Sequence, residues 1–243
     1  MANSLIAIVS CNTREEWRDA IRSTWLPLVP EGTRVVFFSG RGIEARTGPT
    51  HTDEVFLDCD DSYQGLPEKV QCIVKWALDN GYDHVLKLDD DVVLNPTALL
   101  ESGYDQNPYV GVDGHRPCPP ARLFSIASGF AYWMDKQCME LVAKATLPPN
   151  NYDEGWVASV LYEHGIVLHA DQRYYISVCR NLPSIDKRRI GPIKQSPRIR
   201  KEPVPGTFAW CIYLEPNGGT KYSTEAKIAE FKRVFATEVH AKK

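Results

Sequence analysis

Residues 87–93 read Lys87-Leu88-Asp89-Asp90-Asp91-Val92-Val93, with an apolar run on either side of the three aspartates. This pattern predicts a buried strand that ends in acidic residues. Because three adjacent carboxylates repel one another, such a cluster usually binds a cation, and oxygen ligands suit Mg²⁺ or Mn²⁺. Alternation along an extended strand puts Asp89 and Asp91 on one side and Asp90 on the other. We therefore expect a metal site at Asp89 and Asp91; the alternative is a solvated acidic turn.

The composition is that of an ordinary globular protein. The chain has 243 residues, of which 43% are hydrophobic and 24% charged, enough for one large domain or two small ones. Its net charge of −3 gives no reason to expect nucleic acid or an anionic membrane as a partner. No apolar run approaches the ~20 residues that span a bilayer, so we expect no membrane segment. Strand-like residues begin at Leu5, which leaves no room for a signal peptide.

The cysteines indicate a reducing compartment. They are odd in number, scattered and without a C-x-x-C pair, which argues against a disulfide scaffold or a zinc site. We therefore expect free thiols and a cytoplasmic protein, although the lumenal domain of an anchored enzyme would have the same composition. The seven are Cys11, Cys59, Cys72, Cys118, Cys138, Cys179 and Cys211.

Strands and helices alternate in the first half of the chain. Thr13 and Glu16 fit a capping box at the start of the first helix, and Gly81 fits a left-handed end of the second. Such alternation predicts an α/β fold with a mainly parallel sheet, helices on both faces, and ligands at the carboxyl ends of the strands. The expected strands are 5–9, 34–38, 54–57 and the run before Asp89, and the expected helices are 13–25 and 67–78.

The second half is less regular. Residues 180–201 are rich in Arg and Lys and hold three prolines. This basic segment could close over a diphosphate as a lid, or it could be a solvated loop. The expected strands are 109–112, 130–134, 167–169, 174–176 and 208–214, and the expected helices are 135–144, 153–164 and 223–240.

The usual phosphate-binding loops, G-x-x-x-x-G-K-[ST] and G-x-G-x-x-G, do not occur in the sequence. A cation held by carboxylates can take that role by neutralising a diphosphate leaving group. A group-transfer enzyme also needs a base that deprotonates the acceptor hydroxyl. The best candidates are Asp153 and Glu154, at the start of a predicted helix. The alternative is that these two acids only compensate the helix dipole.

Four segments carry a resemblance to a known family. They read R-D-A-I-R-S-T-W at 18–25, D-S-Y-Q-G-L-P-E-K at 61–69, K-L-D-D-D-V at 87–92 and D-E-G-W-V at 153–157. They are similar to the R-x-x-I-R-x-T-W, D-x-Y-x-N-L-x-x-K, K-x-D-D-D-V and E-D-V-x-x-G elements of the family-31 glycosyltransferases, which include β-1,3-galactosyl-, β-1,3-N-acetylglucosaminyl- and Fringe-type enzymes. Here Gly65 replaces the family's Asn, the order of the two acids at 153–154 is reversed, and Gly155 replaces the family's first Val.

The resemblance implies a single GT-A domain over residues 1–243, a UDP-sugar donor, Mn²⁺ or Mg²⁺, and inversion at the anomeric carbon. Residues 1–95 would bind the nucleotide sugar, 96–180 would supply the acceptor and catalytic half, and 181–243 would add the basic segment, a strand and a helix. Asp91 would be a direct metal ligand. Glu154 occupies the position of the family's catalytic Asp, and Asp153 is the alternative base.

Further candidates follow from the same comparison. Residues after the first strand lie where a GT-A fold receives the nucleotide base, although an ordinary turn and helix cap would look alike. Lys69 and Lys87 could contact the donor or simply neutralise the acids. His169, at a strand end, could complete the metal shell of Asp89 and Asp91, or it could have a purely structural role. The nucleotide-sugar-binding residues that we expect are Ser10, Asn12, Arg14, Asp61, Lys69, Lys87, Asp89 and Asp90.

These observations predict an inverting, metal-dependent glycosyltransferase that moves a sugar from a nucleoside diphosphate to an acceptor hydroxyl of a glycan or glycoprotein. Two other classes share part of the pattern. A Mg²⁺-dependent phosphohydrolase would use the aspartates without an acceptor sugar. A carbohydrate-binding module would bind glycan without metal or donor.

Overall fold

The computed structural model describes residues 3–41, 51–113, 124–150, 152–178, 205–213 and 224–240. The basic segment at 180–201 lies outside these residues, as do Cys118 and Cys179. The five cysteines inside them are free thiols, as expected. Within the described residues, no helix has both the length and the apolar composition that a bilayer crossing requires.

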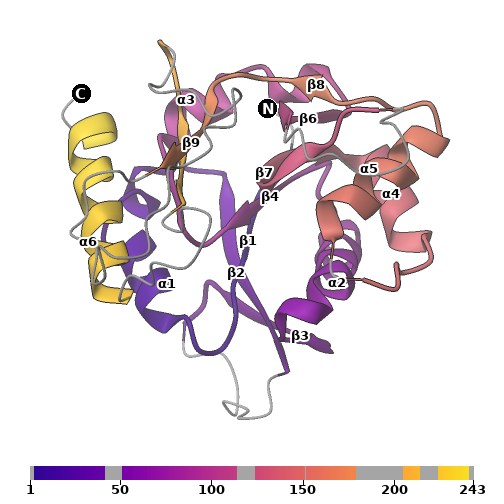
Figure 1. Ribbon diagram of the computed structural model, residues 1–243, viewed down its shortest axis with the longest axis horizontal. Coiled ribbons are helices and arrows are strands. Elements are labelled where there is room, and N and C mark those ends of the chain that lie inside the picture. Colours follow the sequence, from indigo (N-terminus) through magenta and orange to yellow (C-terminus); the bar gives the residue numbers. More distant parts are fainter. Residues whose placement is uncertain are drawn as a thin grey trace, which may run out of the picture.

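A sheet of seven strands forms the centre of the fold, in the order β3-β2-β1-β4-β7-β6-β8 (Figure 1). The four strands of the first half pair in parallel: β1 with β2, β1 with β4, and β2 with β3. Strand β7 runs antiparallel to both β4 and β6, so the sheet is mixed rather than all parallel. The strands are β1 (Ser4–Val9), β2 (Arg34–Arg41), β3 (Glu54–Asp60), β4 (His84–Asp89), β6 (Tyr109–Asp113), β7 (Ala127–Asp135) and β8 (His169–Ala170).

A second sheet of three strands was not expected from the sequence. It places β10 (Ala209–Tyr213) between β5 (Val92–Leu94) and β9 (Tyr174–Val178). Strand β5 begins directly after the aspartate cluster, and Val93 pairs with Trp210 of β10. The chain therefore returns from its last third to support the residues that follow Asp91.

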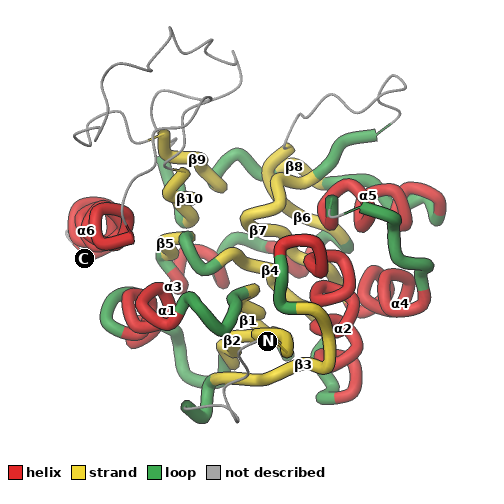
Figure 2. Tube along the Cα trace, turned by 60° about the horizontal axis from the view of Figure 1, so that its bottom comes forward, coloured by secondary structure: helices red, strands yellow, loops and turns green. Residues whose placement is uncertain are grey.

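Helices cover both faces of the large sheet, as predicted (Figure 2). One face carries α1 and α6, and the other carries α2, α4 and α5. Strand β1 shows why both faces need covering: Ile6 and Ile8 join one buried core, and Leu5 and Ala7 join the other. The helices are α1 (Glu15–Arg22), α2 (Leu66–Asp79), α3 (Pro96–Leu100), α4 (Lys136–Lys144), α5 (Asp153–Glu163) and α6 (Thr224–Val234), which continues as a π-helix over Phe235–Val239.

The predicted helix ends were right for α2 and wrong for α1. Gly81, after α2, has the left-handed φ of 76° that the Asn-Gly pair predicted. The capping box at Thr13 is not formed: α1 begins after Arg14, and no side chain caps it. The hydroxyl of Thr13 instead lies 3.3 Å from the sulfur of Cys11, within hydrogen-bond distance, in the turn after β1.

Candidate active site

Three groups of predicted site residues meet at one edge of the large sheet. Because β4 pairs in parallel with β1, with Val9 opposite Asp89, the turns that follow these strands lie side by side. Strand β3 ends at the same edge, which brings Asp61 close to Asn12. The predicted site residues thus lie together at the carboxyl ends of β1, β3 and β4, the edge where open α/β sheets usually bind ligands.

Asp90 turns inward from this edge and joins a buried network. One of its oxygens accepts hydrogen bonds from the Ser10 hydroxyl and from Nε of Arg14, both at 2.9 Å. Its other oxygen lies 2.6 Å from the Arg14 guanidinium. The hydroxyl of Ser10 also accepts from the buried Arg18, at 3.1 Å. These contacts fix the turn between β4 and β5, so Asp90 and Ser10 brace the site rather than face a ligand.

Asp61 and Lys69 form a second buried brace. Their side chains are 7% and 2% exposed, and Nζ of Lys69 lies 2.6 Å from Asp61 Oδ1. Asp61 also accepts from the backbone N–H groups of Asn12 at 2.7 Å and Gly40 at 2.6 Å, while Lys69 donates to the carbonyl of Ser10. The pair ties the ends of β1, β2 and β3 to α2. Both residues were expected to contact the donor. In the structure their charged groups form an ion pair with each other.

Gly65 departs from the family pattern for a structural reason. A Cβ at this position would lie 2.5 Å from the carbonyl oxygen of Asp60 and 2.6 Å from its Cβ. Contacts with a backbone oxygen at that distance do not occur, so no side chain fits here without moving the chain. The turn between β3 and α2 therefore leaves no room for the side chain of the Asn in the family pattern.

Lys87 lies at the centre of the site. Its ammonium is 2.5 Å from Asp89 Oδ1, donates to the carbonyl of Gly129 in β7, and is 3.8 Å from Asp153 Oδ2. Burial opposes the charged form of Lys87, but the attraction of Asp89 and Asp153 outweighs it and raises the pKa of the ammonium. Lys87 is thus a permanent cation that joins the metal motif on β4 to the acids on α5.

Asp153 and Glu154 form a buried acid pair at the start of α5. Asp153 Oδ2 finds no hydrogen-bond partner among the described residues. Burial raises the pKa of Asp153, Lys87 lowers it and Glu154 raises it, and the net result is a pKa of about 6. Glu154 lies directly over Gly129, where an added Cβ would be 3.0 Å from its carboxyl carbon. The sequence pattern did not identify Gly129.

Asp89 and Asp91 are the carboxylates that could hold a metal ion. The Asp89 side chain remains 38% exposed beside Lys87. Burial and the charges of Asp89 and Asp90 raise the pKa of Asp91 to about 7. Such mutual repulsion is what a divalent cation would relieve, and two carboxylates with open positions suit an ion that also binds diphosphate. Among the described residues, no group of three or more His, Cys, Asp or Glu side chains is arranged to hold a metal ion.

His169 does not lie with these aspartates. It is exposed on β8 and level with Leu86 of β4, as the pairing through Val110 and Trp133 shows. Three steps between neighbouring strands separate β8 from β4, about 14 Å at the usual spacing. The structure therefore gives no support to His169 as a ligand of the same ion. In the sequence, a position at a strand end suggested a metal ligand, but the sequence does not show which strands are neighbours in the sheet.

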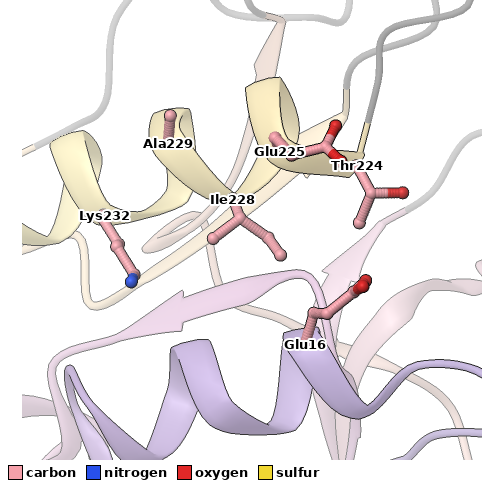
Figure 3. Close-up of a pocket in the computed structure, with 6 residues that line it drawn as sticks. All are labelled: Glu16, Thr224, Glu225, Ile228, Ala229 and Lys232. Atoms are coloured by element: carbon pink, nitrogen blue, oxygen red, sulfur yellow. The ribbon is translucent and has the colours of Figure 1, made fainter.

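Another hollow lies outside this edge. A groove of about 340 Å³ runs between α1 and α6 (Figure 3). None of the predicted site residues lines it. Its lining residues are Glu16, Thr224, Glu225, Ile228, Ala229 and Lys232.

Comparison with known proteins shows which family the chain resembles. The Galactosyltransferase family model matches residues 16–110, which hold three of the four segments described above. This match confirms the resemblance: the protein is a glycosyltransferase similar to the family-31 galactosyltransferases. No curated protein sequence matches the chain.

Two solved structures are similar at low sequence identity. One, assigned as a nucleotide-diphospho-sugar transferase from Desulfovibrio desulfuricans G20, is 12% identical with a TM-score of 0.44 and covers 69% of this chain and 79% of its own. The other, a CMP:2-keto-3-deoxy-manno-octonic acid synthetase in complex with CTP, is 11% identical with a TM-score of 0.46 and covers 70% of this chain and 89% of its own.

Proposed function

We propose that this glycosyltransferase is a metal-dependent, inverting enzyme that moves a sugar from a UDP-sugar to a hydroxyl of a glycan or glycoprotein. One observation carries the proposal. Lys87 contacts Asp89, the last residue of β4, and lies 3.8 Å from Asp153, which begins α5 next to Glu154, while Asp91 follows in the turn after β4. A transferase needs these two functions, a cation site for the leaving group and a base for the acceptor, next to each other.

The donor side of the site consists of Asp89, Asp91 and Arg14. Asp89 and Asp91 would hold Mn²⁺ or Mg²⁺, and a bound divalent cation would stabilise the charge of the leaving diphosphate. The Arg14 side chain is 37% exposed, and Asp90 engages its Nε and Nη2, which leaves Nη1 to contact a phosphate. The choice of UDP rests on the family resemblance.

The acceptor side consists of the acid pair. Glu154 takes the proton of the acceptor hydroxyl, the acceptor oxygen bonds to the anomeric carbon, and the bond from that carbon to the diphosphate oxygen breaks. The diphosphate leaves with the electron pair, and the single displacement inverts the anomeric carbon. Lys87 orients the site through Asp89 and Asp153 and neutralises part of the buried negative charge.

Calorimetry of UDP binding tests the donor side. With Mn²⁺ present, Asp91→Asn should weaken UDP binding at least ~10-fold, which corresponds to ~1.4 kcal/mol, because the variant loses one carboxylate ligand. The exposed Asp105 provides a control, and Asp105→Asn should bind UDP like the wild type. Equal UDP affinity in Mn²⁺ and in EDTA, or in Asp91→Asn and the wild type, would refute the metal site.

A further inference from the structure

We infer that Gly129 is a positioning residue for Glu154: strand β7 leaves out a side chain at this position, and the Glu154 carboxylate occupies the space. The inference rests on the proposed role of Glu154 as the base. It adds a residue that neither the sequence pattern nor the family match, which ends at residue 110, identifies.

Space, not backbone conformation, requires glycine at this position. The described glycines with positive φ do not include Gly129, so its backbone is accessible to any L-residue. An ideal Cβ on Gly129 would lie 3.0 Å from Cδ of Glu154, 3.1 Å from Oε1 and 3.2 Å from Oε2. All three of its nearest neighbours thus belong to one carboxylate.

Gly129 also binds the ammonium group of Lys87. The Gly129 carbonyl accepts a hydrogen bond from Lys87, whose ammonium pairs with Asp89 and lies 3.8 Å from Asp153 Oδ2. At Gly129 the strand therefore leaves its Cβ side to the Glu154 carboxylate and contacts Lys87, the partner of Asp89, through its carbonyl. This geometry fixes how far the Glu154 carboxylate lies from the aspartates that end β4.

A methyl group at Gly129 should act mainly on this distance. The carboxylate is the far end of a flexible side chain, so it can shift by a few tenths of an ångström at small cost in stability. General-base catalysis is less tolerant, because the base must stay within about 2.6–3.2 Å of the proton that it removes. A misplacement of about 1 Å can cost ~10²-fold in rate.

Gly129→Ala tests the inference against a matched control. We expect kcat to fall at least ~10-fold, with the UDP dissociation constant and the melting temperature nearly unchanged. A crystal structure of the ligand-free variant should show the Glu154 carboxylate displaced from its wild-type position. Gly111→Ala is the control, because its Cβ would be equally crowded, 3.1–3.2 Å from Ala127, Ala131 and Tyr132, but would not touch the acids. It should keep the wild-type kcat.

A double-mutant cycle separates positioning from general strain. Glu154→Asp shortens the acid by one methylene and makes room for the added methyl group. In the Glu154→Asp background, Gly129→Ala should therefore lower kcat by less than about 2-fold. If the two effects multiply instead, the methyl group does not act through the carboxylate and the inference is wrong.

The inference and the proposed function fail in different ways. If Glu154→Gln is inactive while Gly129→Ala has the wild-type kcat, the base stands and the positioning role is refuted. If Glu154→Gln keeps full activity, Glu154 is not the base, and the role of Gly129 falls with it.

Discussion

At the residue scale, the three consecutive aspartates have different tasks. Asp90 is saturated by Ser10 and Arg14 and holds the turn in place. Asp89 pairs with Lys87, and part of its side chain stays exposed. Burial and the charges of Asp89 and Asp90 raise the pKa of Asp91. The sequence alternation assumed an extended strand through all three aspartates, whereas β4 ends at Asp89 and the other two lie in a turn. It did not predict the partners, because Arg14 follows another strand and meets Asp90 only when β1 and β4 pair.

Asp153 gives a residue-scale prediction about pH. Its pKa of about 6 in the folded protein lies above the ~3.9 of an unfolded chain, so the folded state prefers the protonated acid. The resulting stabilisation is fully present below pH ~4 and is lost as the pH rises through ~6. In metal-free protein, Asp153→Asn should remove this loss, which is at most about 3 kcal/mol.

Urea unfolding of both proteins between pH 4 and 7.5 measures this effect. The wild type should lose free energy of unfolding relative to Asp153→Asn as the pH rises. Asp79→Asn, at the exposed end of α2, is the control and should follow the wild type. If the curves of the wild type and Asp153→Asn stay parallel over this range, burial does not raise the pKa of Asp153.

At the scale of elements, periodicity was a good guide to the strands and to most helices. It predicted α2, its left-handed end at Gly81, and the buried runs of β1, β2 and β4. It failed where a local contact competes, as at Thr13, whose hydroxyl contacts the sulfur of Cys11 instead of capping α1. It also missed the short helix α3, since five residues carry little periodic signal.

The turn before α2 gives a prediction at this scale. Gly65→Asn would restore the residue of the family pattern, yet it should lower the free energy of unfolding by about 1–3 kcal/mol, because its Cβ meets the backbone of Asp60 at 2.5 Å. Chemical denaturation measures the change. Gln64→Ala, at an exposed position of the same turn, should have little effect. A variant Gly65→Asn as stable as the wild type would show that the turn relaxes freely.

At the scale of the whole molecule, the sequence predicted the large sheet with helices on both faces but not the second sheet. Strands β5, β9 and β10 are short and far apart in the chain, so no local pattern shows that they pair. The same limit applies to the site. Its acids were found because each ends a strand or begins a helix. The sequence analysis missed Gly129 and wrongly placed His169 near the metal, because the neighbours of these two residues depend on the order of the strands in the sheet.

Transfer activity of Glu154→Gln tests the central claim most directly. Glutamine keeps the shape of the side chain over Gly129 but cannot accept the acceptor proton, and losing a general base typically costs ~10²–10⁴-fold in rate. We predict a fall of that size in kcat, with the UDP dissociation constant and the melting temperature nearly unchanged, and a milder effect for Asp153→Asn. Full activity in Glu154→Gln and in Asp153→Asn would contradict the mechanism, and inactivity of Asp153→Asn alone would exchange the roles of the two acids.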